Sequence, residues 1–233
     1  MARKKPNKMR IIIIGDGGHS KVVQEMVFAK ENYHVVAILD DKYERGFQIE
    51  GVIHAPVSYL IKLLRKGTKV VIAIGDNKVR KEIVEQLPLL PKHYLSIAHP
   101  SAIVSKSATI GFGSVIMPHA IINANAEVGM YSIINTSAIV EHDSTIGDYS
   151  HVSPNATLAG NVSTGEGVHV GSSATIIPGK HLGKWSIIGA GSTVIEHIPA
   201  YSKAVGSPTR IIDRFVNNDK TKKEGELIDR AKN

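Results

Sequence analysis

Residues 128–158 read VGMYSIINTSAIVEHDSTIGDYSHVSPNATL, and an aliphatic residue returns at every sixth position. The same spacing runs from Val104 to Val194, and only Thr164 interrupts the series. A period of six matches neither the helical repeat nor the alternation of a single strand. It is typical of hexapeptide repeats, in which short strands form the flat faces of a parallel β-helix. The repeat therefore predicts an all-β domain over residues 98–212.

Small residues occupy a second fixed place in the repeat, four positions after the aliphatic residue. They are mostly serine or alanine, as at Ser114 and Ala138. We expect one aliphatic side chain of each strand to fill the core and one small residue to fill each corner. Three hexads then form one coil, so residues one coil apart stack about 4.8 Å from each other. Glycine often follows the aliphatic residue, as at Gly129 and Gly147, where we expect it to supply backbone freedom.

The composition excludes several classes of site and partner. None of the 233 residues is cysteine, so disulfides, thiolate metal sites and cysteine acyl-enzymes are excluded. The formal net charge of +7 comes almost entirely from residues 1–10 and 203–233, so we expect two solvated ends and no nucleic-acid partner. The apolar run 11–14 is too short for a signal-peptide core or a membrane span. We therefore expect no membrane span and a cytoplasmic protein.

The chain outside the repeat divides into one domain and two tails. Residues 1–9 are a basic N-terminal tail, and residues 213–233 are a charged C-terminal tail. In residues 10–97, β-branched apolar runs alternate with helical patterns. The expected strands are 10–15, 34–39 and 69–74, and the expected helices follow the first strand and cover 57–65 and 79–87. This alternation predicts a Rossmann-like α/β domain with a parallel sheet of three to four strands.

A glycine turn, Gly15-Asp16-Gly17-Gly18-His19-Ser20, joins the first strand to its helix. A helix that begins at such a turn presents backbone N–H groups to a phosphate. Asp40 and Asp41 end the second strand, where an acid commonly binds a ribose, and Gly75 ends the third. Ser20 breaks the glycine fingerprint of NAD-binding domains, so a nucleotide-sugar site is favoured over NAD. A tight turn without a ligand is the remaining alternative.

An acid flanks His142 on each side in the stretch Glu141-His142-Asp143. Coil stacking places Gly160 directly above His142, where a ligand can approach the backbone. A thioester carbonyl held there could accept a hydrogen bond from the Gly160 N–H while His142 takes a proton from the attacking group. Asp143 could fix the imidazole tautomer and raise its basicity. The alternative is that His142 is surface decoration, as single histidines on a β-helix usually are.

His151 is a second candidate, as a ligand contact or as a metal ligand. Half a coil separates it from His142, so the two lie on different faces of one chain and can meet only across a subunit boundary. A zinc site needs several converging histidines, so no metal is expected. Ser172 and Ala190 stack one coil apart and form the small-walled column that an extended ligand would need.

Several motifs together make the chain similar to a known family. They are GDGGHSKVV at 15–23, LDD at 39–41, AIGDN at 73–77, NTSAIVEHD at 135–143, SHVSP at 150–154 and LAGNV at 158–162. In this order, across residues 10–212, the chain resembles the NeuD/PglD-type sugar acetyltransferases. The motifs within 135–162 are the specific part of the resemblance.

This resemblance implies a left-handed β-helix and a homotrimer with active sites between subunits. It implies acetyl-CoA as the donor, a UDP-linked 4-amino-4,6-dideoxy sugar as the acceptor, and no metal. It also implies that His142 is the general base and that Asp143 raises its basicity. The residues that match acetyl-CoA contacts are His151, Gly160, Ser172 and Ala190, and those that match nucleotide-sugar contacts are Gly17, Gly18, His19, Asp40, Asp41 and Gly75.

Two positions depart from the family pattern. Asp143 stands where the sugar N-acetyltransferases carry glutamate, so its reach to the imidazole is shorter. Thr209 replaces the usual alanine in the motif where the chain leaves the β-helix, near the adenine end of the coenzyme.

The sequence thus predicts an acetyl-CoA-dependent N-acetyltransferase that acts directly on the 4-amino group of a UDP-sugar in polysaccharide or glycan biosynthesis. The nearest alternative is an O-acetyltransferase of the same fold, acting on sialic acid or another sugar hydroxyl. A zinc-dependent hydratase is weaker because the histidine spacing opposes it. A non-enzymatic nucleotide-sugar-binding protein is also weaker because it leaves the acid-flanked His142 unexplained.

Overall fold

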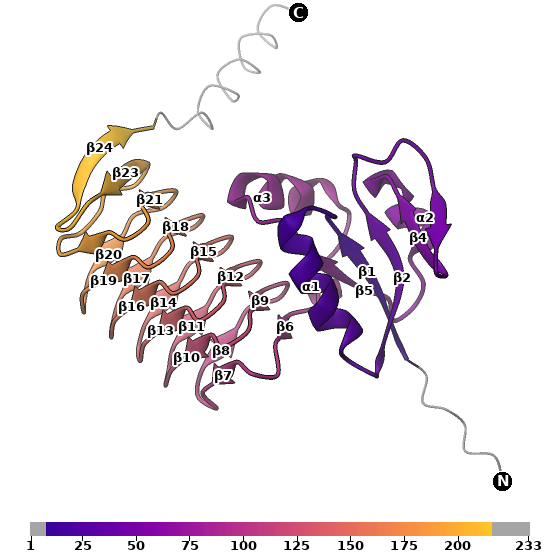
Figure 1. The fold of residues 1–233 in the computed structure, drawn as a ribbon, viewed down its shortest axis with the longest axis horizontal. Coiled ribbons are helices and arrows are strands. Elements are labelled where there is room, and N and C mark those ends of the chain that lie inside the picture. Colours follow the sequence, from indigo (N-terminus) through magenta and orange to yellow (C-terminus); the bar gives the residue numbers. More distant parts are fainter. Residues whose placement is uncertain (1–7, 216–233) are drawn as a thin grey trace, which may run out of the picture.

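The computed structural model describes residues 8–215, so most of both predicted tails lies outside the described residues. An α/β part is followed by a long stack of short strands, and the two lie side by side (Figure 1). No helix within residues 8–215 is long and apolar enough to cross a membrane. The domain boundaries and the cytoplasmic location stay predictions.

The α/β part is built on a five-stranded sheet in the order β3-β4-β2-β1-β5. Its strands are β1 (Met9–Ile14), β2 (Tyr33–Leu39), β3 (Phe47–Ile49), β4 (Val52–Ala55) and β5 (Lys69–Ile72). Parallel pairing joins β1 to β2 and β5, and β2 to β4. The isoleucines of β1 are fully buried because alternate side chains enter two different hydrophobic clusters, Ile11 and Ile13 on one side and Ile12 and Ile14 on the other.

Helices cover this sheet where the helical patterns predict them. They are α1 (Gly18–Phe28), α2 (Leu60–Leu63) and α3 (Asn77–Gln86), with short 3₁₀ turns η1 (Val57–Tyr59) and η2 (Pro91–His93). The Asp76 carboxylate starts α3 by accepting a hydrogen bond from the Val79 N–H at 2.9 Å.

The expected count of three to four strands was wrong, because a hairpin adds β3 to the sheet edge. β3 and β4 pair antiparallel across Glu50 and Gly51, whose φ angles are 49° and 82°. Two successive positive φ angles mark a type I′ turn, which usually carries asparagine or aspartate before the glycine. Glutamate at the first position concealed the turn.

The β-helix consists mainly of two-residue strands that stack on one another (Figure 1) and form three sheets, one on each face. One face contains β7 (Ile103–Val104), β10 (Ile121–Ile122), β13 (Ile139–Val140), β16 (Thr157–Leu158), β19 (Thr175–Ile176) and β22 (Thr193–Val194). The second contains β8 (Thr109–Ile110), β11 (Glu127–Val128), β14 (Thr145–Ile146), β17 (Ser163–Thr164) and β20 (His181–Leu182). The third contains β6 (Ile97–Ala98), β9 (Val115–Ile116), β12 (Ile133–Ile134), β15 (His151–Val152), β18 (His169–Val170) and β21 (Ile187–Ile188), extended by β23 (Ser202–Val205) and β24 (Arg210–Arg214).

Register and burial confirm the coil predicted from the repeat. Ile139 pairs with Ile121 and Thr157, which lie one coil before and after it. The repeating aliphatic residues and the small corner residues, such as Ala138 and Ala156, form one continuous buried core. Each coil therefore depends on its neighbours to bury its own inner surface.

The glycines that follow the aliphatic residues have a different role from the one expected. Left-handed φ angles occur three positions after the aliphatic residue, for example at Tyr131 (56°) and Tyr149 (56°). Gly129 and Gly147 do not have such angles. A Cβ at Gly147 would lie 2.4 Å from the backbone of Gly165 in the next coil. These glycines serve close coil stacking, which the sequence pattern did not distinguish from a need for positive φ.

Candidate active site

The first cavity, of about 400 Å³, opens at the carboxyl ends of β1, β2 and β5. Its wall contains all six residues predicted to bind a nucleotide sugar: Gly17, Gly18, His19, Asp40, Asp41 and Gly75. Apolar side chains, among them Leu39, Val57 and Ile83, complete the lining. An apolar pocket with a few convergent polar groups at this edge of an α/β sheet is typical of a ligand site.

The glycine turn keeps this cavity open for two physical reasons. Gly15 has a φ of 105°, and a Cβ there would lie 2.7 Å from the Ala73 carbonyl oxygen. A Cβ at Gly17 or Gly18 would meet no atom within 4 Å, so these two glycines face open space. Gly15 is thus required by packing, whereas Gly17 and Gly18 leave their backbone accessible to a ligand.

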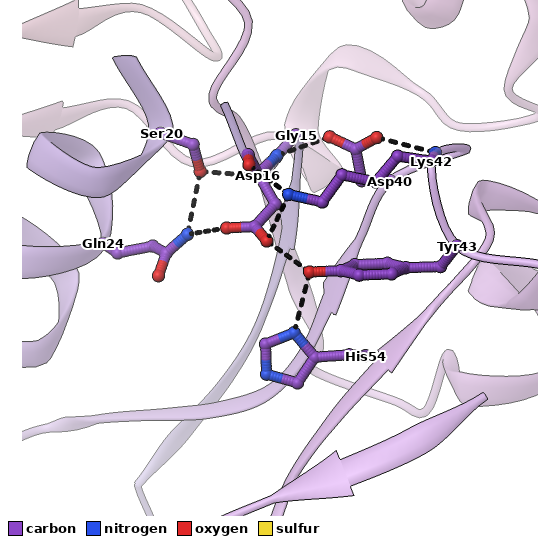
Figure 2. Close-up of polar contacts among 8 residues, drawn as sticks. All are labelled: Gly15, Asp16, Ser20, Gln24, Asp40, Lys42, Tyr43 and His54. Atoms are coloured by element: carbon purple, nitrogen blue, oxygen red, sulfur yellow. Dashed lines mark hydrogen bonds and ion pairs between the residues drawn. The ribbon is translucent and has the colours of Figure 1, made fainter. Parts of the chain in front are cut away.

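A polar network centred on Asp16 fixes the turn against the loop that follows β2 (Figure 2). The Asp16 carboxylate accepts hydrogen bonds from Gln24 and Tyr43 and forms an ion pair with Lys42 at 2.8 Å. Burial alone would raise the pKa of Asp16, but the hydrogen bonds from Lys42, Tyr43 and Gln24 outweigh burial and hold it at about 2.

Asp40 completes the Asp16 network. It accepts the Asp16 N–H at 2.7 Å and the Lys42 N–H at 2.9 Å. Sequence reasoning assigned Asp40 to a ribose, but in the structure both of its oxygens also organise the two loops. The sequence did not predict the contact between Asp16 and Lys42, because no motif spacing marks it.

A second cavity, of about 380 Å³, lies where the loop after β5 and the start of α3 meet the β-helix. It is lined by His151 and His169, which stack one coil apart with ring centroids 5.1 Å from each other. The His19 ring approaches from the α/β part, 6.4 Å from the His151 ring. His19 Nε2 and His151 Nδ1 are buried, and neither has a hydrogen-bond partner within residues 8–215.

His19 and His151, the junction histidines between the α/β part and the β-helix, are held in the neutral form. Burial lowers the pKa of His151 to about 3, and the nearby His169, Arg80 and His19 reinforce the effect. Burial, with a contribution from Arg80, lowers the pKa of His19 to about 4. At neutral pH both imidazoles can therefore donate and accept hydrogen bonds without carrying charge.

His142, Asp143 and Gly160 meet at a corner of the β-helix, as the stacking predicts. His142 Nδ1 lies 2.8 Å from Asp143 Oδ2, and a Cβ at Gly160 would lie 2.7 Å from His142 Nε2. The shorter aspartate thus reaches the imidazole, from a corner position with a φ of 58°. Asn125, one coil earlier, donates a hydrogen bond to the other carboxylate oxygen at 3.1 Å.

The environment of His142 is opposite to that of the junction histidines. Its side chain is 62% exposed, and the hydrogen bond to Asp143 raises its pKa. With Nδ1–H donated to Asp143, Nε2 is free to accept a proton. Gly160 packs against this ring, and its N–H donates to no backbone carbonyl in the described part of the chain. The corner thus offers a base and a hydrogen-bond donor to one ligand.

The remaining predicted residues lie elsewhere on the prism. Ser172 and Ala190 follow β18 and β21 at a different corner from His142, and His151 lies on the face that precedes that corner. The structure therefore brings His19 and His151 together and brings His142, Asp143 and Gly160 together. It does not join the two groups within one chain. Among residues 8–215, no three histidine, aspartate or glutamate side chains converge as metal ligands.

Comparison with known proteins places this geometry in a family. The sequence profile described as the PglD N-terminal domain matches residues 10–87. The crystal structure of PerB from Caulobacter crescentus, in complex with CoA and GDP-perosamine, has 36% identity and a TM-score of 0.78, covering 87% of this chain and 97% of PerB. The chain belongs to the NeuD/PglD-type sugar acetyltransferases.

Two other members of the NeuD/PglD-type family support the assignment. The acetyltransferase domain of PglB from Neisseria gonorrhoeae has 32% identity and a TM-score of 0.80, covering 88% of this chain and all of that domain. UDP-N-acetylbacillosamine N-acetyltransferase of Bacillus subtilis is 46% identical over 109 residues. That match covers 46% of this chain and spans only half the length of the Bacillus protein.

Family membership confirms the predicted fold, an α/β domain followed by a left-handed parallel β-helix. The handedness could be predicted only from the resemblance, because a repeat of six carries no sense of rotation.

Proposed function

We propose that this protein transfers an acetyl group from acetyl-CoA to the amine of a nucleotide-linked amino sugar. The acceptor class is a UDP-linked 4-amino-4,6-dideoxy sugar, and the product serves glycan or polysaccharide biosynthesis. One observation carries the proposal: the exposed His142 is paired with Asp143 and packed against Gly160, whose N–H donates to no backbone carbonyl within residues 8–215. The relatives named for sugar N-acetyltransfer support the reaction class.

The transfer is direct. The sugar amine attacks the thioester carbonyl carbon, and His142 Nε2 takes the proton that the amine loses. The Gly160 N–H donates a hydrogen bond to the oxyanion of the tetrahedral intermediate. The C–S bond then breaks, CoA leaves as the thiol after receiving a proton from the imidazolium, and the amide remains on the sugar. Asp143 stabilises the imidazolium while it exists and holds the reactive tautomer.

The nucleotide is assigned to the first cavity, with Gly17, Gly18 and Asp40 at its phosphate and ribose ends. Acetyl-CoA is assigned to the surface that carries Gly160 on one subunit and Ser172 and Ala190 on another. Those two corners are separate within one chain, so the site is completed in a homotrimer. A mass in solution of three chains supports this assembly, whereas a stable active monomer contradicts it.

The test is a CoA-release assay with acetyl-CoA and UDP-4-amino-4,6-dideoxy-N-acetylglucosamine. Wild-type protein should turn over, and His142→Ala should lose a factor of about 10²–10⁴ in rate, as expected for a general base. His119→Asn is the control, because His119 is another exposed corner histidine and asparagine tolerates its φ of 59°. Turnover with a sugar hydroxyl but not with an amine would instead establish the O-acetyltransferase. Equal rates for His142→Ala and wild type would refute the mechanism.

A further inference from the structure

Three stacked coils present unpaired backbone carbonyls at the corner of the β-helix that faces α3. Tyr131, Tyr149 and Gly167 lie one coil apart, and all three have left-handed φ angles. Their N–H groups bond to the preceding coil, but no backbone N–H within residues 8–215 bonds to their carbonyl oxygens. Carbonyls turned away from the ladder need partners from another element when they are buried.

Two side chains of α3 supply those partners. Arg80 donates from Nε to the Tyr131 carbonyl at 2.7 Å and from Nη2 to the Tyr149 carbonyl at 2.8 Å. Asn77 donates to the Gly167 carbonyl at 3.1 Å, and its own side-chain oxygen accepts from Arg80 Nη2 at 2.7 Å. One arginine and one asparagine thus connect α3 to three consecutive coils.

Arg80 also holds the other side of the junction. Its Nη1 donates to the carbonyls of Ile74 at 2.8 Å and Gly75 at 3.1 Å, in the loop that follows β5. The side chain is only 1% exposed and forms no ion pair with a carboxylate within residues 8–215. All five N–H donors are engaged, so Arg80 cannot itself bind a ligand. Burying a charged side chain costs free energy, and here all of its hydrogen bonds go to carbonyl oxygens. We infer that Arg80 is buried for the geometry that it imposes on these carbonyls.

The geometry that Arg80 imposes is the position of Gly75 relative to His151. Gly75 lines both cavities, the nucleotide cavity of the α/β part and the junction cavity that contains His151 and His169. Arg80 bonds to Gly75 on one side and to Tyr149, two residues before His151, on the other. The two cavities therefore meet at a point that a single side chain fixes.

We propose that Arg80, assisted by Asn77, is a positioning residue. It aligns the nucleotide cavity with the β-helix face that carries His151 and His169, called here the histidine face, so that both act on one acceptor molecule. The inference rests on the proposed function, because it concerns where the acceptor amine is held. Misplacing a bound reactant by about 1 Å costs a rate factor of roughly 10². Loss of the Arg80 hydrogen bonds should therefore lower kcat far more than it weakens nucleotide binding.

The experiment compares Arg80→Lys with Lys81→Met. Arg80→Lys keeps the charge but has three donors on one atom and cannot span the carbonyls that the guanidinium joins. Lys81 is the next residue of the same helix and also bridges to the β-helix, through an ion pair with Glu166 at 2.5 Å. Its Nζ lies over the rings of Tyr149 and Trp185, but within residues 8–215 no hydrogen bond or ion pair joins it to Gly75, His151 or His169. Lys81→Met thus removes one contact between α3 and the β-helix, the ion pair with Glu166, and keeps the hydrogen bonds of Arg80. Asn77→Ala is a milder variant in case Arg80→Lys does not fold.

The expected result is a kcat for Arg80→Lys lowered about 10- to 100-fold at saturating substrates, with the dissociation constant of UDP changed less than about threefold. Lys81→Met should leave both within about threefold, at a temperature where all variants are folded. Unchanged kcat in Arg80→Lys, or parallel losses of kcat, UDP binding and Tm in both variants, overturns the proposal.

A second readout does not depend on turnover, so it separates this proposal from the proposed function. Histidine-selective NMR follows the imidazoles of His19 and His151 while UDP is added. In the wild type, UDP should shift both signals, because the cavities meet at Gly75. In Arg80→Lys the His19 shift should persist and the His151 shift should be lost. A retained His151 shift refutes the positioning role, even if the wild type proves inactive towards amino sugars.

Discussion

His142 at the β-helix corner and His151 at the junction are the same side chain in opposite surroundings. His142 is exposed and paired with a carboxylate, which raises its pKa. His151 is buried between other basic groups, which lowers its pKa to about 3. The difference shows how one residue type can serve two tasks: the first is suited to carry a proton and the second to form hydrogen bonds without charge.

After the loss of His142 itself, the largest expected effect tests the contact between His142 and Gly160. In Gly160→Ala the new Cβ would lie 2.7 Å from two imidazole atoms, so the ring must move away from its place against Gly160. We expect kcat to fall about 10- to 100-fold with little loss of stability, because a side chain can yield where a backbone cannot. Steady-state kinetics and thermal melts measure the two quantities.

Gly171→Ala is the matched variant for Gly160→Ala. Its Cβ would meet the Ala190 nitrogen at 2.6 Å and the Ile188 oxygen at 2.7 Å, both of them backbone atoms. Overpacking of this kind costs about 1–3 kcal/mol, which lowers Tm by about 2–10 °C. If Gly160→Ala lost stability in the same way and kept its kcat, the corner would be structural rather than catalytic.

Asp143→Asn sharpens the comparison from the side of the exposed histidine. Removing the carboxylate lowers the pKa of His142, since the Asp143 hydrogen bond is the main cause of its elevation. The reaction needs neutral imidazole, so the acid limb of the pH–rate profile should move to lower pH, while the plateau falls roughly tenfold because the base is weaker.

Glu141→Gln is the control for the flanking acids. Within residues 8–215 the Glu141 side chain hydrogen-bonds to the backbone N–H of His142, at 3.3 Å, and its charge raises the pKa of His142 less than the Asp143 hydrogen bond does, so the acid limb of Glu141→Gln should move much less. A profile in which Asp143→Asn and Glu141→Gln behave alike would contradict the assigned role of Asp143.

The last expected effect acts on stability and not on rate, and it concerns the buried histidine and the pH dependence of unfolding. The pKa of His151 is depressed in the folded state, so below about pH 6.5 the unfolded chain binds a proton that the folded chain does not. The contribution of His151 to the free energy of unfolding is therefore fully present above pH 6.5. It declines by about 1.4 kcal/mol per pH unit as the pH falls towards about 3.

His151→Gln should flatten that decline in denaturant titrations between pH 6.5 and 4. His119→Asn should leave the slope unchanged, because His119 is exposed. An equal slope in wild type and His151→Gln would show that His151 is protonated in the folded protein.

Much of the site was predictable because stacking converts sequence separation into spatial contact. Residues one coil apart must be neighbours, so Gly160 over His142 and His169 beside His151 followed from counting. The first cavity was predictable for a related reason, since parallel strands end at the same edge of a sheet and bring Gly17, Asp40 and Gly75 together.

The sequence by itself determined the β-helix, the α/β sheet before it and the pairing of His142 with Asp143, because these depend on short or periodic separations. Only the tertiary structure decided how the two parts meet. Arg80 and Asn77 find their carbonyls 51 to 90 residues away, and no repeat relates α3 to a β-helix corner. The same holds for Asp16 and Lys42, whose contact depends on the packing of two loops. Local and periodic contacts are encoded in residue spacing, whereas contacts between the α/β part and the β-helix depend on how their surfaces fit together.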